Sequence, residues 1–544
     1  MWLKKFVRVK RGNPVQAFLS NNRSASSSPK SAIEANSWQR FGCGPRLEPQ
    51  ETLIHRAIEA QASARPQAIA AEHQGQSITY GELNRQANRL AATLLKQGVV
   101  ADDHVALFVE RSIPMLVGML AVLKIGAAYI PQHVGITPAA QLQHILCVAR
   151  VRVVLTLANL ASALPLTTEQ QCIDLDAFIS ADSVAADDRN IGSTASSPDS
   201  LCFVLFTSGT TGLPNGVRVT QRNLCNILLT APGNLGMRPG LKVGQILNIA
   251  FDMSAWEVLG CLAHGATLLI RGKDIAQTAE RCDVLIATPS ILATLDPARC
   301  NQLKVVALAG EPCPQPLADR WAAFCTFYNA CGPTETTIVN TMQHYEGIGP
   351  LTIGKPTPNN TVYVLDEAGQ LCGPGEQGEM WAGGDCVTAG YLGNPELTAE
   401  RYQPDPFLGN GRLMFRTRDL GRWTADGELE HLGRVDDQVK VRGFRVELDS
   451  VSAALEATPR CERAVTLKLD SRHLVAFVYP ASTDVDLARS CCEERLAYYC
   501  VPSLILAVEA IPLTSRGKVD KRLLLDWAVA HQAQNARVEQ SVTA

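Results

Sequence analysis

Residues 206–216 read FTSGTTGLPNG and follow an apolar run, residues 201–206, whose length and composition predict a buried strand. Glycine lets the backbone turn tightly and bring its N–H groups close to a ligand, and clustered N–H and hydroxyl donors suit phosphate oxygens. Taken alone, the stretch is more typical of an ordinary surface turn, because the G-x-x-x-x-G-K-[ST] pattern of other phosphate loops is missing. The motifs that follow it along the chain favour a phosphate-binding loop at the end of a strand instead.

The composition of the chain narrows the classes of protein to which it can belong. Its 544 residues suffice for about three to four average domains, and 46% of them are hydrophobic. The net charge of −3 argues against a nucleic-acid binder that works through bulk electrostatics, and no charge-free apolar run is long enough to predict a membrane span. The 17 scattered cysteines contain no C-x-x-C pair, which indicates free thiols in a reducing compartment. We therefore expect a cytoplasmic protein.

The first 45 residues differ from the rest of the chain. Residues 1–33 contain seven Lys or Arg and no Asp or Glu, and they include a serine-rich patch. This composition is typical of a mitochondrial transit peptide, but a disordered tail or a mis-called start site is the interpretation that we prefer. On either interpretation we expect residues 1–45 to stay outside the folded core.

Strand-like and helical segments alternate after this extension. Apolar runs such as residues 105–109, 151–156 and 284–288 are separated by segments with helical spacing, which predicts an α/β fold with parallel strands. Ligands in such sheets bind where loops leave the carboxyl ends of strands, and residues 206–216 lie at such a place. Gly and Pro turns after Gly354 predict a small β subdomain, and a final α+β piece begins near Gly433.

Further motifs follow the glycine-rich stretch in a fixed order. They are FDMSAWE (251–257), NACGPTE (329–335), GEMWAGG (378–384), FRTRDLGRW (415–423), GRVDDQVKVRGFRVE (433–447) and RGKVDK (516–521), with ITYGEL (78–83) and LKIGAAYIP (123–131) before it. Together they resemble the motifs of the adenylate-forming superfamily, and within it the amino-acid adenylation domains of non-ribosomal peptide synthetases. The resemblance covers residues 45 to 525.

The resemblance implies a fold and a division of the chain into domains. We expect a large N-terminal adenylation core at residues 46–432, made of α/β layers plus the small β subdomain. A small mobile α+β lid domain at residues 433–525 and a tail at residues 526–544 would follow. Asp436 matches the hinge about which the lid rotates. One arrangement brings Lys518 into the site, and the other brings in the segment around Gly443.

The resemblance also implies a reaction and its partners. An amino-acid carboxylate attacks the α-phosphate of ATP in the presence of Mg²⁺, which releases pyrophosphate and gives an aminoacyl-adenylate. The acyl group then passes to the phosphopantetheine thiol of a carrier protein. No serine in a Gly-Gly-x-Ser setting occurs before Ala544. We therefore expect the carrier to act in trans or to lie on a longer parent chain.

The resemblance assigns roles to the residues that would hold ATP and Mg²⁺. Glu335 would hold Mg²⁺, Asp419 would accept the ribose hydroxyls, Arg434 would give a second ribose contact, and Lys518 would bridge the substrate carboxylate and the α-phosphate. A helix-terminal acid, two turn residues and a solvated lysine are the respective alternatives. The remaining nucleotide contacts would come from Thr207, Ser208, Gly209, Thr210, Thr211, Gly212, Gly332, Pro333 and Thr334.

Asp252 decides the substrate class. It precedes an apolar helix, so its carboxylate is expected to be buried, and a buried carboxylate needs a partner such as the α-ammonium of an amino acid. An N-cap of a helix that begins near Ser254 is the alternative. The resemblance completes the side-chain pocket with Met253, Trp256, Ile286, Ala307, Ala309, Ala330, Ile338 and Val339. This uncharged lining with small walls predicts an aromatic or bulky aliphatic substrate, although plain core packing would look the same.

The chain departs from the family pattern at several positions. Asn215 stands where the phosphate loop usually has lysine, Cys331 replaces a tyrosine that stacks on adenine, and Arg418 replaces a glycine. Gln132 and His133 interrupt a usual Leu-Asp-Pro. These departures keep two alternatives open: a ligase for carboxylic or aryl acids, and a catalytically silent module.

Overall fold

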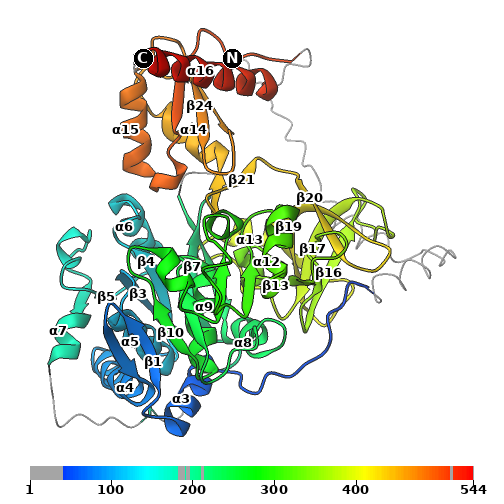
Figure 1. The fold of residues 1–544 in the computed structure, drawn as a ribbon. Helices are drawn as coiled ribbons and strands as arrows, with labels where there is room; N and C mark the ends of the chain where they lie inside the picture. Colours follow the sequence, from blue (N-terminus) through cyan, green and yellow to red (C-terminus); the bar gives the residue numbers. More distant parts are fainter. Residues whose placement is uncertain (1–40, 182–189, 192–195, 210–212, 515–518, 543–544) are drawn as a thin grey trace, which may run out of the picture.

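The apolar run before the glycine-rich stretch forms strand β7 (Leu201–Thr207) in a six-stranded sheet (Figure 1). The computed structural model describes residues 41–181, 190–191, 196–209, 213–514 and 519–542. In this sheet β8 pairs antiparallel with β7, whereas its other neighbouring strands pair in parallel. The order is β6 (Gln171–Asp174), β5 (Val153–Thr156), β3 (His104–Val109), β4 (Ala128–His133), β7 and β8 (Asn215–Thr220).

A second, nine-stranded sheet has a parallel centre and antiparallel edges, and its central strands read as short apolar runs because both faces are covered. Its order is β15 (Lys355–Pro356), β14 (Thr341–Tyr345), β13 (Thr326–Cys331), β12 (Val305–Leu308), β11 (Val284–Ala287), β9 (Lys242–Gln245), β10 (Thr267–Ile270), β1 (Ile69–His73) and β2 (Gln76–Thr79).

One hydrophobic core unites these two sheets with helices α3 (Ile54–Ala64), α4 (Tyr80–Lys96), α5 (Ile113–Lys124), α8 (Gln221–Leu229) and α9 (Asp252–Ala263). Helix α6 (Ala139–Val148) covers the other face of the six-stranded sheet. The shorter helices are α7 (Leu175–Ser180), α10 (Ile275–Ala279), α11 (Pro289–Leu292), α12 (Gln315–Ala322) and α13 (Pro395–Arg401).

A small antiparallel sheet follows the two large ones, as the Gly and Pro turns predict. It consists of β16 (Asn360–Leu365), β17 (Gly378–Gly384), β18 (Tyr402–Pro404), β19 (Leu413–Trp423) and β20 (Leu429–Arg434). Because β20 continues to Arg434, the boundary expected after residue 432 falls inside a strand.

The C-terminal lobe has its own cores and stands above the larger lobe in Figure 1. It begins with the hairpin β21 (Gln438–Val441) and β22 (Phe444–Glu447), which lies against the larger lobe. Its remaining elements are α14 (Leu448–Glu456), β23 (Arg463–Lys468), β24 (Leu474–Tyr479), α15 (Val485–Arg495), β25 (Leu504–Ala507) and α16 (Lys521–Val542). The expected α/β fold class, with a small β subdomain and a C-terminal α+β domain, is confirmed.

The structure corrects two expectations about the ends of the chain. Cys43 bridges to Thr361 and Phe41 packs against Trp423, so residues 41–45 join the β subdomain instead of staying outside the core. The expected tail after residue 525 continues helix α16, and Ala528 is buried against β24. Residues 1–40 lie outside the described residues. No helix within the described ranges is both long and apolar enough to cross a membrane.

Candidate active site

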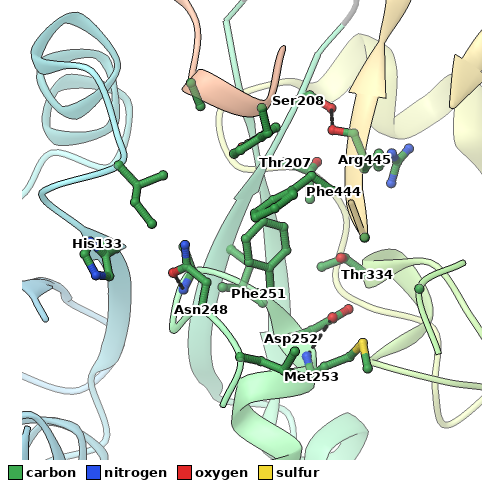
Figure 2. A pocket seen from close by; sticks show the side chains of 18 of the residues that line it. His133, Thr207, Ser208, Asn248, Phe251, Asp252, Met253, Thr334, Phe444 and Arg445 are labelled. Carbon is green, nitrogen blue, oxygen red and sulfur yellow. Dashed lines mark hydrogen bonds between the residues drawn. The ribbon is translucent and has the colours of Figure 1, made fainter. Parts of the chain in front are cut away.

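A cavity of about 390 Å³ opens between the two lobes, at the carboxyl ends of strands from both large sheets. The end of β7, the loop before α9, the N-terminus of α9 and hairpin β21–β22 form its walls (Figure 2). Its lining includes Thr207, Ser208, Asp252, Gly443 and Arg445. The cavity thus brings sequence-predicted residues from three motifs together.

The glycine-rich stretch forms the connection between β7 and β8, where Thr207 pairs with Asn215. The Ser208 hydroxyl donates to the backbone carbonyl of Arg445 at 2.9 Å, so the loop contacts the C-terminal lobe. A Cβ at Gly209 would lie 2.4 Å from the Leu213 carbonyl oxygen, which explains why only glycine fits there. Thr210, Thr211 and Gly212, as well as Lys518, lie outside the described residues.

Glu335 follows β13 in a short 3-10 turn and is fully buried. Its carboxylate accepts from the Tyr391 hydroxyl at 2.6 Å and from the Arg445 guanidinium at 2.8 Å. Burial raises the pKa of this carboxyl, but the charges of Arg445 and Arg401 and the Tyr391 hydrogen bond outweigh burial and bring it to about 2. Glu335 is therefore a fixed anion at neutral pH.

Gly332, Pro333 and Thr334 make the turn between β13 and Glu335. A Cβ at Gly332 would lie 2.6 Å from the Cα of Val339, so this turn also requires glycine. The Thr334 side chain forms a hydrogen bond with Asp252, which links the turn to the N-terminus of α9.

Asp252 is the first residue of α9 and lines the cavity (Figure 2). Phe251, not Asp252, occupies the N-cap position, and the Asp252 carboxylate accepts from the neighbouring Met253 N–H at 2.8 Å. Burial raises the pKa of the Asp252 carboxyl, an effect that Thr334 and the charge of Lys440 offset only in part. The N-terminal end of the helix and the adjacent cavity make this carboxylate a candidate partner for a cation.

The other residues of the predicted substrate pocket divide into two groups. Met253, Ala309 and Ile338 line the cavity with Asp252. A second group is buried but contributes no wall to it: Trp256, Ile286, Ala307, Ala330 and Val339. The indole N–H of Trp256 donates to the Gly233 carbonyl at 2.6 Å. Only some of the residues predicted for the substrate pocket therefore line the cavity.

The segment that presents Ile338 has an unusual backbone. Thr337 and Ile338 have φ values of 50° and 73°, in the left-handed region that non-glycine residues rarely adopt. The Thr337 hydroxyl donates to the Cys386 carbonyl at 2.9 Å and ties the turn to the β subdomain. Strain of this kind is common where a backbone has to place side chains at a ligand site.

Asp419, Arg434 and Asp436 form one chain of ion pairs at the junction of the lobes. Arg434 donates to Asp419 at 2.6 Å and to both carboxylate oxygens of Asp436 at 2.7 and 3.0 Å. Burial raises the pKa of Asp419, but a hydrogen bond from His431 and the charge of Arg434 outweigh it and lower the pKa. The predicted ribose residues and the predicted hinge residue thus contact one another directly.

Two of the departures from the family pattern have a structural explanation. Arg418 has a φ of 63°, which accounts for the usual glycine at its position, and its guanidinium instead forms ion pairs with Glu400 and Asp436. The Asn215 carboxamide accepts from Asn394 at 3.2 Å. Burial raises the pKa of the Cys331 thiol to about 12, next to a small cavity that Trp381 and Asp419 also line.

Hairpin β21–β22 supplies residues that the sequence reasoning missed. Lys440 pairs directly with Arg445 across the two strands, so both side chains extend from the same face. Arg445 binds Glu335, and the charge of Lys440 acts on Asp252 and Asp419. A signal was present, because VKV and FRV flank an Arg-Gly pair that suits a two-residue hairpin turn.

Aromatic rings hold the same hairpin against both lobes. Phe444 stacks on Tyr499 of the C-terminal lobe, with ring centroids 4.0 Å apart, and meets Phe251 of the larger lobe edge-on at 4.9 Å (Figure 2). Aromatic pairs in such arrangements each stabilise by about 0.5–1.5 kcal/mol beyond the area that they bury. These ring contacts therefore stabilise the hairpin in its position at the cavity in this arrangement of the lobes.

The Glu335 carboxylate suits Mg²⁺, a hard cation that prefers oxygen ligands and keeps several water molecules. Glu335 offers a buried, ionised carboxylate, and the residue that binds it, Arg445, also contacts Ser208 at the end of β7; phosphate oxygens and water would complete the shell. Within the described ranges no group of three or more His, Cys, Asp or Glu side chains forms a metal cage. The residues thus fit a metal that arrives with a phosphate ligand.

Comparisons with known proteins identify the family of the chain. Residues 58–392 match the family model described as AMP-binding enzyme. The chain is 44% identical over 92% of its length to adenylate-forming reductase 06235 of Coprinopsis cinerea, of which it covers 49%. It is 34% identical over 88% of its length to gramicidin S synthase 1 of Brevibacillus brevis, of which it covers 44%.

Solved structures show the same fold. An artificially fused adenylation–PCP di-domain from Klebsiella oxytoca superimposes with a TM-score of 0.75 at 23% identity, over 85% of this chain and 94% of that one. An o-succinylbenzoate CoA synthetase from Bacillus subtilis does so with a TM-score of 0.74 at 21% identity, over 88% and 98%. The chain spans about half the length of the two Coprinopsis reductases that it matches. By its family match and its fold, the chain belongs to the AMP-binding enzymes of the adenylate-forming superfamily, and its relatives include adenylation domains of non-ribosomal peptide synthetases.

Proposed function

We propose that the chain activates an amino acid as its aminoacyl-adenylate, with release of pyrophosphate, and passes the acyl group to a phosphopantetheine thiol of a carrier protein. Asp252 carries the proposal. Its buried carboxylate lies on the cavity wall, and the cation that acts on it most strongly is Lys440 of the hairpin. The α-ammonium of an amino acid would supply the missing charge when the hairpin is withdrawn.

The other groups would position ATP and spread charge at the reacting phosphorus. Glu335 would hold Mg²⁺, which would draw negative charge from the phosphate oxygens, and Thr207 and Ser208 would donate hydroxyl groups. Asp419 and Arg434 would bind the ribose, and Lys518 would accompany the substrate carboxylate. Met253, Ala309 and Ile338, which are apolar, support an aromatic or bulky hydrophobic side chain as the substrate.

The test is exchange of labelled pyrophosphate into ATP with a panel of amino acids and their deamino analogues. We expect exchange with a hydrophobic amino acid. Asp252→Ala should lower it by at least about a hundredfold, since loss of one partner of a buried ion pair costs about 3–5 kcal/mol. Asp199→Ala, at an exposed aspartate far along the chain, is the control and should change nothing.

A second candidate is activation of a carboxylic acid that has no α-amine, for later reduction of its thioester. The likeness to proteins named adenylate-forming reductases favours this candidate. It requires exchange with a deamino acid, and Asp252→Ala should then leave the exchange rate within about twofold of the wild type. Tight ATP binding without exchange for any acid would reject both candidates and favour a silent module.

A further inference from the structure

Arg418 lies on an irregularity of β19 that faces the junction of the lobes. One residue of β17, Met380, stands opposite three residues of β19, 417–419, so the ladder bulges here. A bulge changes the direction of the side chains that it carries and is common beside functional sites. Next to Arg418 in the bulge, Asp419 contacts Arg434, whereas Arg418 itself reaches the connection between the lobes.

Arg418 contacts this connection through its backbone and through its side chain. Its carbonyl accepts from the Val435 N–H at 3.0 Å, and Nη1 of its guanidinium lies 3.6 Å from an Asp436 oxygen. Nη2 of the same guanidinium donates to Glu400 of α13, which packs on β18 and β19 of the larger lobe. Two carboxylates thus bind different nitrogens of one guanidinium, and Arg418 bridges α13 to the connection.

The two cations that bind Asp436 differ in how they depend on the arrangement of the lobes. Arg434 donates to both Asp436 oxygens at 2.7 and 3.0 Å, and it lies only two residues away. A pair so close in the sequence can persist when the chain rotates at residue 436. The pair with Arg418 depends on where Asp436 lies relative to β19, so such a rotation has to break it.

The backbone at position 418 does not require an arginine. Its φ of 63° lies in the left-handed region, where glycine is favoured and a residue with a Cβ is strained. A glycine, which the family pattern has at this position, would offer the same carbonyl to Val435 but no charge. The arginine therefore accepts a backbone strain and adds an ion pair that only its guanidinium can make.

We propose that Arg418 is a positioning residue that holds the hinge carboxylate Asp436 against the larger lobe and so favours the arrangement of the lobes seen in Figure 1. The side chains of Arg418 and Asp436 are 27% and 20% exposed, so water screens the pair in part. We expect a bias of about threefold to fivefold, the upper range for pairs at a surface. The inference rests on the hinge role of Asp436 in the proposed function.

The test measures the arrangement of the lobes in the ligand-free protein. Donor and acceptor dyes on non-canonical amino acids at Ile348 and Val529, both exposed, report the distance between the lobes by energy transfer in single molecules. Arg418→Gln should lower the ratio of molecules in the arrangement of Figure 1 to all others by about threefold to fivefold. Arg422→Gln, which breaks a pair with Glu430 within the same sheet, should leave this ratio unchanged. Equal ratios for the two variants would overturn the proposal.

A double-mutant cycle tests the partner. Asp436→Asn should lower the ratio by itself, since Asp436 also loses its charged contact with Arg434. In the Asp436→Asn background, Arg418→Gln should change the ratio by less than about 1.5-fold, because its partner charge is already absent. A loss as large as in the wild-type background would overturn the pairing. The difference between the wild type and Arg418→Gln should also vanish at about 1 M salt, which screens partly exposed charges.

A second variant separates the arrangement of the lobes from the stability of the fold. Arg418→Gly fits the left-handed backbone, so it should melt no lower than the wild type and still lower the ratio as Arg418→Gln does. A glycine variant with the ratio of the wild type would overturn the role of the guanidinium. Pyrophosphate exchange, measured separately, shows whether the proposed function has failed, since the ligand-free ratio does not depend on it.

Discussion

Glu257 is a buried carboxylate that holds two residues of the cavity wall, Ile246 and Leu247, in place. It lies on α9 and accepts from the backbone N–H groups of Ile246 and Leu247 at 2.8 and 3.2 Å. Arg111 donates to the carbonyls of the same two residues, at 3.3 and 2.9 Å. The cavity-lining loop is thus held from two sides. Burial raises the pKa of the Glu257 carboxyl to about 8, despite the two backbone N–H groups and the charge of Arg111.

This shift predicts a pH dependence of stability. Between pH 6 and pH 8 the folded state keeps the Glu257 proton while the unfolded state has lost it, so a rise in pH favours unfolding. The wild type should lose about 2 kcal/mol of unfolding free energy over this range through Glu257, at about 1.4 kcal/mol per pH unit. Urea unfolding at both pH values measures it. Glu257→Gln should remove the loss, and an equal loss in this variant would assign the effect to another group.

At the scale of single elements, hairpin β21–β22 shows how a short sequence can dictate a local structure. Arg442 and Gly443 have φ values of 53° and 83°, as a two-residue turn with two left-handed residues requires. This turn sets Lys440 opposite Arg445. A Cβ added to Gly443 would lie 2.7 Å from the Cγ2 atom of Thr288, so the tip of the hairpin approaches the larger lobe closely.

Gly443→Ala should therefore hinder docking of the hairpin more than the first half-reaction. We expect pyrophosphate exchange within about twofold of the wild type and transfer to a phosphopantetheine thiol reduced by about tenfold, since the added methyl group meets Thr288 and the left-handed backbone costs about 1–2 kcal/mol. Thr288→Ser removes the atom in contact, and its hydroxyl can still cap α11. The double variant should regain part of the transfer rate; no recovery would place the cause elsewhere.

Local sequence patterns predict strands and turns, but they do not predict the directions in which side chains point. The apolar run at residues 201–206 predicts strand β7, and the glycine at position 332 marks a turn. The structure gives the reason for that glycine, because a Cβ would not fit there. The pairing of Arg445 with Glu335 joins residues far apart in the sequence and depends on how two lobes meet. Likewise, nothing near Trp256 in the sequence shows that its indole reaches Gly233 and leaves the cavity wall to others.

At the scale of the whole molecule, the ends of the chain were the least predictable part. The segment after residue 525 is polar enough to look like a tail, yet α16 packs one face on the C-terminal lobe. Leu524 and Ala528 are fully buried against β24, and Trp527 meets Phe477 edge-on at 6.5 Å. The N-terminal end of the described chain also packs on the fold, because the ring of Phe41 contacts Trp423. Both contacts depend on distant strands.

Helix α16 should therefore stabilise the C-terminal lobe. Ala528→Asp places a charge in its core and should cost at least about 3 kcal/mol, whereas Val529→Asp, at a neighbouring position that is 57% exposed, should cost less than about 0.5 kcal/mol. Both variants introduce the same residue into the same helix; because alanine is a better helix former than valine, helix propensity accounts for only about 0.6 kcal/mol of the expected difference. Calorimetric melting of both compares them. Equal melting temperatures would show that α16 does not stabilise the C-terminal lobe.

The raised pKa of the half-buried Cys331 thiol has a chemical consequence. An acyl-adenylate is a mixed anhydride that a nearby thiolate could attack, and Cys331 stands where the resemblance to the adenylation domains implies a tyrosine. With a pKa of about 12, its thiol stays protonated at neutral pH and is a poor nucleophile. Under the proposed function, the protonated thiol of Cys331 would not compete with the carrier thiol for the acyl group.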